Sequence, residues 1–282
     1  MTSPIGLFDS GLGGLSVARV LLRHRPGDSL WVVGDTAHVP YGGRPLEQVR
    51  GFALDLTDYL ARGGCRAVVM ACNISSAVAL DEARRRCAIP VFGMVDAGAR
   101  AAATSPGVAF GVMATEGTVR SGAYDAALRR LRPEAVVESI ACPRFVPLVE
   151  SGRWEAEEAY AAAIEYAAPL IERGVDTVIL GCTHYPFLEA AIRAAFPYPI
   201  RLLDPAETVA QDLDRALGPT LAREAPRHRF ESTADPVAFS EAGSILLSLP
   251  FTARHCPVWE ENAECGMMND EYRTRQPMSH AS

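Results

Sequence analysis

Two cysteines, Cys72 and Cys182, occupy the same kind of position in the sequence and could together perform acid–base chemistry. Each follows a short apolar run typical of a buried strand and precedes a stretch with helical character. Because a helix N-terminus favours the thiolate, we expect both thiols to ionise more easily than a free cysteine. If the two sulfurs flank one carbon atom, one thiolate can accept a proton while the opposing thiol donates one, which inverts that carbon.

Such a reaction at the α-carbon of an amino acid needs assistance, because the α-proton is a very weak acid. Without an electron sink, the barrier must be lowered by desolvation, preorganised electrostatics and groups that manage the thiol protons. Three titratable residues near matching strand ends could do this: Asp9 in the first half, and Glu150 and His184 in the second. Singly, Asp9 could instead cap a turn and His184 could be a structural histidine, so the hypothesis depends on the whole set.

The remaining cysteines and the possibility of a metal site have plainer interpretations. Four cysteines are interpreted as small buried apolar residues: Cys65, Cys87, Cys142 and Cys256. Cys265 lies in the polar C-terminal stretch. No C-x-x-C pattern occurs and Cys182-x-His184 is a lone pair, so we predict no metal site.

A glycine-rich turn, Gly11-Leu12-Gly13-Gly14, follows one predicted strand and opens a helix. It could hold a phosphate, but the dinucleotide-binding fingerprint requires a glycine where Ser16 stands. An alternative is that Ser10 and the turn amides hold a substrate carboxylate. Polar residues at neighbouring helix starts could do the same: Asn73, Ser75 and Thr183.

The composition excludes several classes of function. All 27 basic residues of the 282-residue chain are arginine, so no lysine can form a Schiff base with pyridoxal phosphate or serve a phosphate-binding loop. Pyridoxal phosphate held as a Schiff base is therefore excluded as a cofactor. The net charge of −7 argues against nucleic acid or an anionic membrane surface as the partner, and leaves a small-molecule substrate.

The cellular location is expected to be the cytoplasm. Seven cysteines without framework spacing fit reduced thiols. No apolar run reaches the roughly 18 residues that span a bilayer, and the stretch from Met1 to Pro4 has no secretory pattern.

The elements that position these residues alternate between strands and helices, which predicts an α/β fold with mostly parallel sheets covered by helices on both faces. The predicted strands cover residues 4–10, 29–35, 65–72, 90–95, 108–115, 135–142, 177–182 and 200–203. The predicted helices cover residues 14–24, 46–62, 75–87, 118–131, 155–173, 187–196 and 206–217. Ligands bind beyond the carboxyl ends of such strands, where both cysteines fall.

The two halves of the chain resemble each other, which predicts two pseudo-symmetric lobes with the active site in the cleft between them. Three segments recur in the same order at offsets of 106, 107 and 110 residues: the strand end at Gly11 recurs at Gly117, Val39-Pro40 recurs as Val146-Pro147, and Cys72-Asn73 recurs as Cys182-Thr183. We expect a discontinuous first lobe of residues 1–95 and 206–255, a second lobe of residues 96–205, and a mobile tail of residues 256–282.

Several of these stretches resemble the signature motifs of bacterial glutamate racemases. The motifs are Phe8-Asp9-Ser10-Gly11-Leu12-Gly13-Gly14, the segment from Gly34 to Gly42, Ala71-Cys72-Asn73, and the segment from Gly181 to Pro186. Cys142-Pro143 with the segment from Phe145 to Gly152 resembles a fifth motif, and Asp204-Pro205-Ala206 resembles the return to the first lobe. The resemblance runs from about residue 5 to about residue 250.

The resemblance implies a cofactor-independent interconversion of L- and D-glutamate that supplies D-glutamate for peptidoglycan synthesis. Cys72 would take the α-proton from D-glutamate and Cys182 from L-glutamate, with Asp9 assisting Cys72, and Glu150 and His184 assisting Cys182. The residues implied to bind substrate are Ser10, Pro40, Tyr41, Gly42, Asn73, Ile74, Ser75, Thr115, Thr118 and Thr183. Members of the family are often homodimers.

One residue departs from the family pattern. The family usually has a threonine after Cys-Asn, where this chain has Ile74, so Ser75 or a backbone amide must replace the missing hydroxyl, or binding is weaker. This leaves open a racemase of the same superfamily that acts on aspartate or another acidic amino acid. A non-catalytic ligand-binding protein is the third possibility, but such a protein would need neither thiol nor the assisting groups.

Overall fold

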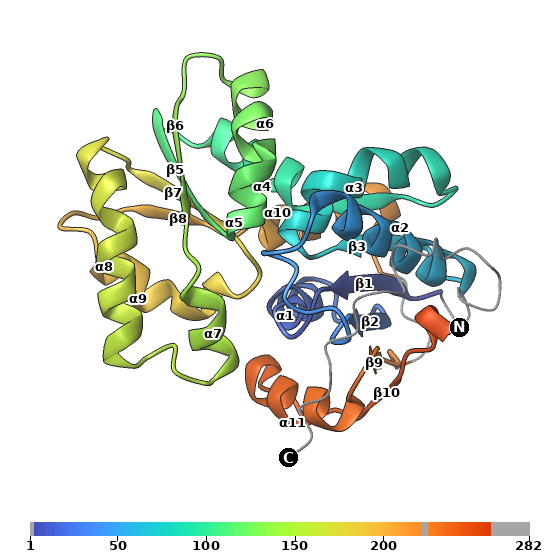
Figure 1. Ribbon diagram of the computed structural model, residues 1–282. Coiled ribbons are helices and arrows are strands. Elements are labelled where there is room, and N and C mark those ends of the chain that lie inside the picture. Colours follow the sequence, from blue (N-terminus) through green and yellow to red (C-terminus); the bar gives the residue numbers. More distant parts are fainter. Residues whose placement is uncertain (1–2, 221–224, 261–282) are drawn as a thin grey trace.

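The computed structural model describes residues 3–220 and 225–260, and its strands form two separate sheets (Figure 1). The first sheet has the order β10-β9-β2-β1-β3-β4 and the second β6-β5-β7-β8. Every paired strand runs parallel to its neighbour, so the predicted α/β class with parallel sheets is confirmed. The strands are β1 (Ile5–Asp9), β2 (Leu30–Gly34), β3 (Ala67–Met70), β4 (Val91–Gly93), β5 (Ala109–Ala114), β6 (Val136–Ala141), β7 (Thr177–Gly181), β8 (Arg201–Leu203), β9 (Arg229–Ser232) and β10 (Ala253–His255).

Helices cover both faces of the first sheet. Successive side chains of a strand point to opposite faces, so Leu7 packs in one core and Phe8 in the other. The Leu7 core is closed by α1 (Gly14–His24), α10 (Pro205–Leu217) and α11 (Pro236–Leu247), and the Phe8 core by α2 (Leu46–Arg62) and α3 (Asn73–Arg86). The central strands are buried throughout, as strands covered on both faces must be.

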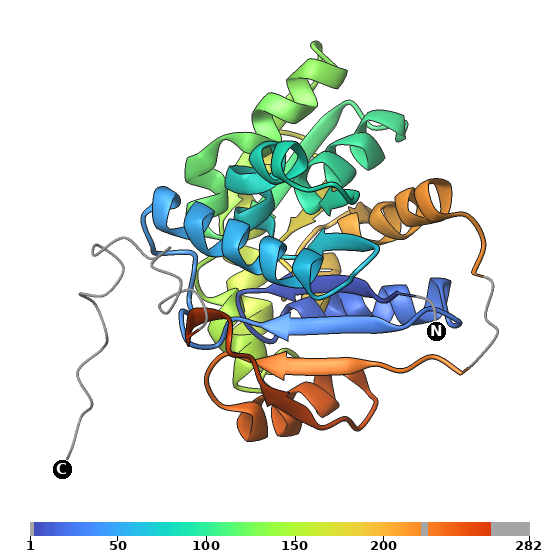
Figure 2. The ribbon, with the colours of Figure 1, turned by 90° about the vertical axis from the view of Figure 1, so that its right-hand side faces the viewer.

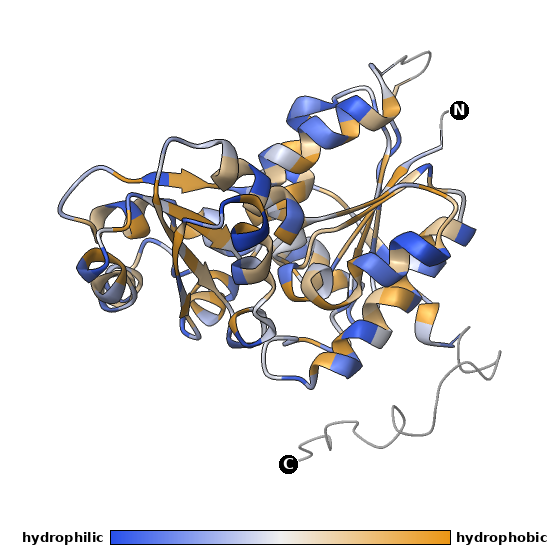
Figure 3. Ribbon diagram, turned by 90° about the horizontal axis from the view of Figure 1, so that it is seen from above, coloured by the Kyte–Doolittle hydropathy of each residue, from blue (hydrophilic) through white to orange (hydrophobic). Residues whose placement is uncertain are grey.

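The second sheet is covered in the same way (Figure 1). One face packs on α7 (Phe145–Glu150), α8 (Glu157–Glu172) and α9 (Glu189–Ala194), and the other on α4 (Met94–Thr104) and α6 (Ala123–Leu131). Two short elements, α5 (Glu116–Ser121) and the 3-10 helix η1 (Tyr185–Leu188), follow β5 and β7. Figure 3 shows hydrophobic strands in both sheets beneath helices that carry hydrophilic residues on their outer surfaces.

The strand order repeats between the two sheets, which supports the predicted duplication. The order β2-β1-β3-β4 of the first sheet corresponds strand by strand to β6-β5-β7-β8 of the second. The three recurring sequence pairs therefore follow equivalent strands, and Cys72 after β3 corresponds to Cys182 after β7. The last strands, β9 and β10, join the first sheet beside β2 (Figure 2).

Most of the predicted elements form, and the differences have local causes. The predicted helix 118–131 is two helices, because the chain turns at Gly122 with φ +64°. The predicted strand 90–95 ends at Gly93, and α4 begins at Met94. Elements that we did not predict are α4, α7, β9, α11 and β10. Within the described residues, no helix is long and apolar enough to cross a membrane.

The boundary between the lobes is shared by one helix. On α4, Met94 and Ala97 pack in a core of the first sheet, whereas Val95 and Ala99 pack in a core of the second. The predicted boundary after residue 95 falls inside this helix, so the division into lobes stays a prediction.

The start of the predicted tail is not a free end. Cys256 and Val258 are buried, and the Trp259 side chain packs on the first sheet's α2, against Phe52. The prediction of a tail from residue 256 is therefore wrong for residues 256–260. The rest of it, residues 261–282 with Cys265, lies outside the described residues.

Candidate active site

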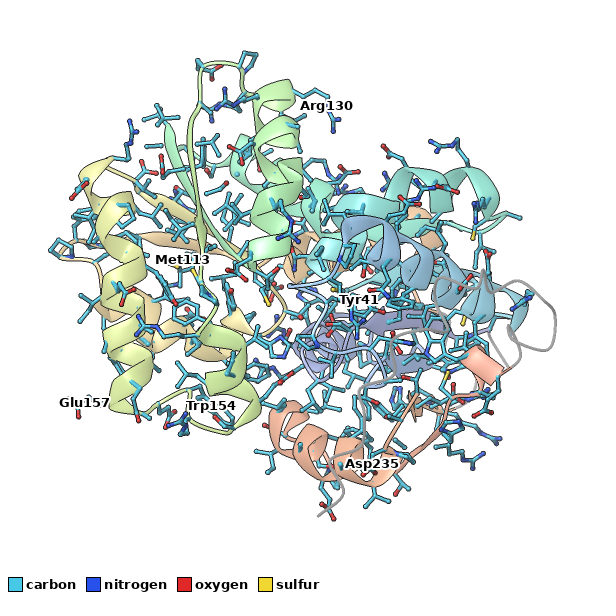
Figure 4. The ribbon with its side chains drawn as sticks, in the orientation of Figure 1. Tyr41, Met113, Arg130, Trp154, Glu157 and Asp235 are labelled. Carbon is cyan, nitrogen blue, oxygen red and sulfur yellow. The ribbon has the colours of Figure 1, made fainter. Side chains whose placement is uncertain are left out.

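A cavity of about 410 Å³ lies where the carboxyl ends of both sheets' strands meet. Its wall comes from the segments after β1, β2 and β3 in the first sheet and after β5, β6 and β7 in the second. Figure 4 shows Tyr41, one wall residue, close to β1 of the first sheet. The predicted site residues that line the cavity are Ser10, Pro40, Tyr41, Gly42, Cys72, Asn73, Ile74, Thr115, Thr118, Glu150, Cys182, Thr183 and His184. Asp9 and Ser75 do not line it.

The Cys72 thiol is held in its protonated form by its surroundings. Cys72 is the N-cap of α3 and is 6% exposed. Burial and the neighbouring Asp9 carboxyl raise the pKa of the Cys72 thiol to about 12, although the backbone N–H and the hydroxyl of Ser75 lower it. The prediction that the helix N-terminus makes this thiol easy to ionise is therefore wrong, because desolvation outweighs the helix dipole. Ser75 lies behind the cavity wall, fully buried beside Cys72.

Cys182 is surrounded differently. It precedes the four-residue η1 and not the long helix predicted from residue 187, so an imidazole and not a helix is its main partner. The Cys182 Sγ lies 3.7 Å from Nδ1 of His184, and Nε2 of His184 lies 3.2 Å from Oε1 of Glu150. Burial alone would lower the pKa of His184, but the contacts with Cys182 and Glu150 outweigh it and raise the pKa to about 10. A protonated His184 would stabilise a thiolate at Cys182.

Asp9 lies below the cavity wall and joins the two lobes. Its Oδ1 accepts a hydrogen bond from the Thr183 hydroxyl at 3.2 Å, and its Oδ2 accepts one from the Gly11 N–H at 3.1 Å. Burial raises the pKa of Asp9, and the charge of His184 and these donors lower it in part. Asp9 therefore does not face the cavity, and its charge raises the pKa of the Cys72 thiol.

The glycine-rich turn allows the second lobe to approach the first. A Cβ atom at Gly13 would lie 2.2 Å from Oγ1 of Thr183 and 2.5 Å from Nδ1 of His184, so only glycine fits there. The Ser16 hydroxyl donates to the Thr183 carbonyl at 2.7 Å, which fixes the contact. None of the turn glycines lines the cavity, so the turn serves lobe packing, while Ser10 alone faces the ligand space.

Polar groups in the cavity wall supply donors for an anionic ligand. The Asn73 side chain is 3% exposed, and its Nδ2 has no hydrogen-bond partner in the described protein. The Thr115 and Thr118 hydroxyls lie 3.0 Å apart at the start of α5. The Tyr41 hydroxyl, in contrast, donates to Oδ2 of Asp35 at 2.6 Å and is engaged away from the ligand space.

Ile74 contributes an apolar surface where the resemblance implies a hydroxyl. It is 3% exposed, and a Cβ atom at Gly117 would lie 2.3 Å from its Cδ1, so the side chain packs against the start of α5. Ser75 does not line the cavity, and its buried hydroxyl has no hydrogen-bond partner among the described residues. Substrate binding by Ser75, or by a backbone amide in its place, stays a prediction.

The sequence did not predict two groups of residues at or near the cavity. The first lines the cavity: Val39, Gly43, Glu116, Cys142, Pro143, Val146, Pro147 and Gly181. The repeat could have indicated Glu116, which corresponds to Ser10 at the offset of 106 residues. The second group surrounds Asp35, which also accepts hydrogen bonds from Thr233 at 2.7 Å and from Nε1 of Trp259 at 2.9 Å. No sequence signal connects Trp259 with the site.

The described residues contain no group of three or more His, Cys, Asp or Glu side chains that could hold a metal ion. The cavity wall carries three thiols, an imidazole with its carboxylate partner, the Glu116 carboxylate and several neutral donors.

Comparisons with known proteins agree on one family. Residues 16–213 match the family described as Asp/Glu/Hydantoin racemase. The glutamate racemase of Corynebacterium diphtheriae is 43% identical over 250 residues, which cover 87% of this chain and 94% of that protein. A glutamate racemase isoform from Bacillus anthracis superposes with a TM-score of 0.85 at 33% identity, covering 90% of this chain and 97% of the other.

A glutamate racemase from Francisella tularensis, solved in complex with D-glutamate, has a TM-score of 0.84 at 29% identity and covers 91% of this chain and 98% of its own. These likenesses agree with the repeated sheets, the shared cavity and the two cysteines. They show that the chain belongs to the glutamate racemases of the Asp/Glu/Hydantoin racemase family.

Proposed function

We propose that this chain interconverts L- and D-glutamate without a cofactor, by proton transfer between the substrate α-carbon and the thiols of Cys72 and Cys182. The observation that carries the proposal is that one cavity is lined by both cysteines, each at the carboxyl end of an equivalent strand. Family membership supports glutamate as the substrate.

In the direction from L- to D-glutamate, Cys182 is the base. Its thiolate, paired with the His184 imidazolium, takes the α-proton, and the C–H electron pair stays on the α-carbon and its carboxylate. Cys72, kept protonated by its raised pKa, then donates its proton to the opposite face and becomes the thiolate. The reverse reaction exchanges the two roles.

Substrate binding is assigned to the neutral donors of the wall. The free amide hydrogens of Asn73 and the hydroxyls of Thr115 and Thr118 can pair with carboxylate oxygens, and charge-assisted hydrogen bonds of this kind are the stronger ones. Glu116 and Glu150 also line the cavity and suit an ammonium group.

The alternative substrate, aspartate, is shorter by one methylene. The relatives named above are glutamate racemases, which supports glutamate over the shorter acid. A pocket discriminates one methylene by only about 1–3 kcal/mol, so weak turnover of aspartate would be compatible with the proposal.

The test is racemisation by purified protein without added cofactor. L-glutamate and, separately, L-aspartate are followed by circular dichroism, and glutamate is expected to lose its signal faster. Cys72→Ala and Cys182→Ala should each abolish turnover in both directions, whereas Cys87→Ala, at the end of the same helix as Cys72, should retain it. Full activity of either active-site variant would refute the two-thiol mechanism.

We also propose a role in supplying D-glutamate for peptidoglycan, a cytoplasmic location and a homodimer. The location is supported by the need to keep seven cysteines reduced, and the dimer by the family resemblance alone. Sedimentation of the purified chain tests the dimer, and a monomer at working concentration would contradict it.

A further inference from the structure

The Asn73 side chain lines the cavity beside Cys72 and has one unpaired donor. Asn73 is the first residue of α3, directly after Cys72, and its side chain is almost fully buried. Its Oδ1 accepts a hydrogen bond from the Tyr124 hydroxyl at 2.7 Å, while its Nδ2 has no partner in the described protein. A buried amide with one satisfied end and one free donor end is poised for a ligand, because an unpaired buried donor is costly.

Tyr124 reaches Asn73 from the other lobe. It lies on α6, against the second sheet, and is 2% exposed, whereas Asn73 follows a strand of the first sheet. The ring fits because position 98 on α4 is a glycine, where a Cβ atom would lie 3.0 Å from the Tyr124 ring. The hydrogen bond therefore crosses the lobe boundary.

The direction of this hydrogen bond fixes the orientation of the amide. Burial, and after it the charge of Asp204, raise the pKa of Tyr124 well above its usual value, so the hydroxyl keeps its proton. Among the described residues, Asn73 is the hydroxyl's hydrogen-bond partner. Since the hydroxyl needs an acceptor, the amide oxygen turns toward Tyr124 and the NH2 group turns away from it. Without Tyr124, nothing else in the described protein would distinguish the two ends of the amide.

We propose that Tyr124 is a positioning residue for racemisation: its hydroxyl holds the Asn73 amide so that the NH2 group donates to a carboxylate of the substrate. The inference rests on the proposed function for the identity of that substrate. It adds that the contact between the lobes sets the orientation of a binding group beside Cys72. Tyr124 itself does not line the cavity.

The test is a double-mutant cycle on Tyr124 and Asn73. Tyr124→Phe keeps the ring and removes only the hydroxyl, and we expect it to raise KM and the Kd for D-glutamate by roughly tenfold, the value of one hydrogen bond to a charged group. kcat should change by less than about threefold, since the thiols are untouched. In the Asn73→Ala background, Tyr124→Phe should have no further effect on the Kd.

The matched control is Tyr198→Phe, which removes another hydroxyl hydrogen bond in the second lobe, from Tyr198 to the Val175 carbonyl at 3.2 Å. It should leave KM and Kd unchanged. Thermal unfolding and circular dichroism check that every variant folds.

Two results would overturn the inference. The first is a Tyr124→Phe variant whose Kd lies within twofold of that of the original protein. The second is that Tyr124→Phe weakens binding as much in the Asn73→Ala background as it does in the original protein. The second result would make Tyr124 a packing residue. If the original protein binds D-glutamate but does not racemise it, the proposed function fails while the Kd cycle still decides the role of Tyr124.

Discussion

At the scale of single residues, the two thiols of this pseudo-symmetric site are not equivalent. Cys72 is a buried thiol beside a carboxyl, with its pKa raised to about 12, whereas Cys182 is paired with an imidazole whose pKa is raised to about 10. The resting site therefore keeps Cys72 as a thiol and places a cationic imidazole beside Cys182, which suits one acid and one base in a two-base proton transfer.

The contribution of His184 can be measured by His184→Gln. Glutamine keeps a polar side chain but cannot carry the positive charge that stabilises the Cys182 thiolate, so we expect kcat to fall about 100-fold or more. L- and D-glutamate have equal free energies in water, so kcat/KM must fall equally in both directions. His255→Gln, which removes an exposed histidine paired with Glu260, is the matched control. A kcat like that of the original protein in His184→Gln would contradict the assignment.

The raised pKa of His184 also predicts how stability depends on pH. The folded-state value of about 10 lies above the ordinary 6.5, so the folded protein binds this proton more tightly than the unfolded chain. The resulting stabilisation is complete below about pH 6.5 and is lost as the pH rises through about 10. We expect the difference in unfolding free energy between the original protein and His184→Gln to shrink from pH 6.5 to pH 10 in urea titrations. A constant difference would show that His184 is neutral when folded.

At the scale of elements, the glycine-rich turn before α1 is a spacer between the lobes. Gly13→Ala places a methyl group within 2.5 Å of both Thr183 and His184 side chains, so the segment after β7 must move. A displacement of about 1 Å can cost about 100-fold in rate, and we expect a loss of that size in kcat. Gly11→Ala, in the same turn, meets its neighbours at an ordinary 3.5 Å and should retain activity. Equal activity of the two variants would disprove this role of the turn.

The segment after β10 supports, from outside the cavity, the Val39–Gly43 segment of its wall. Trp259 donates to Asp35, which also holds the Tyr41 hydroxyl, and the Val39–Gly43 segment lines the cavity. Trp259→Phe should lower the free energy of unfolding by about 2 kcal/mol and raise KM several-fold, because the loop loses one anchor. Trp31→Phe removes a similar indole hydrogen bond, to Glu231, and should lower stability without changing KM. Unfolding in urea measures the stability of both variants, and initial rates measure their KM. An unchanged KM in Trp259→Phe would show that the segment after β10 does not support the active site.

The sequence predicted those elements whose signals are local. The apolar runs of β1 and β3 and the amphipathic pattern of α2 are sufficient to assign them, and the duplication placed both cysteines at strand ends. Gly122 was visible as a glycine, but its positive φ, which divides α5 from α6, depends on packing. The contact of Trp259 with Asp35 joins residues 224 positions apart, and that of Tyr124 with Asn73 joins residues 51 positions apart. At Cys72, the balance between burial and the helix dipole depends on the folded surroundings of the thiol. Such long-range terms have no pattern in the sequence.

At the scale of the whole molecule, the lobes are tied together by more than the substrate. Helix α4 contributes side chains to a core of each sheet and packs along α10, where Arg100 pairs with Asp212. The Ser16 hydroxyl bonds to the Thr183 carbonyl across the boundary. A structure that shares a helix between two cores cannot expose one core without disturbing the other, which favours one cooperative unit.

This arrangement predicts a single unfolding transition for both lobes. Trp31 lies in the first sheet, and Trp154 packs beside Phe187 at the second. In variants that retain only one of these tryptophans, the others being replaced by phenylalanine, fluorescence reports one lobe and far-ultraviolet circular dichroism reports the whole chain. We expect coincident midpoints in urea for both variants. D-glutamate at about 100 times its Kd should stabilise both by about 2.7 kcal/mol, because it binds only where the lobes meet. A fluorescence midpoint that precedes the dichroism midpoint in one variant would show that its lobe opens alone, and that the shared helix does not couple the two cores.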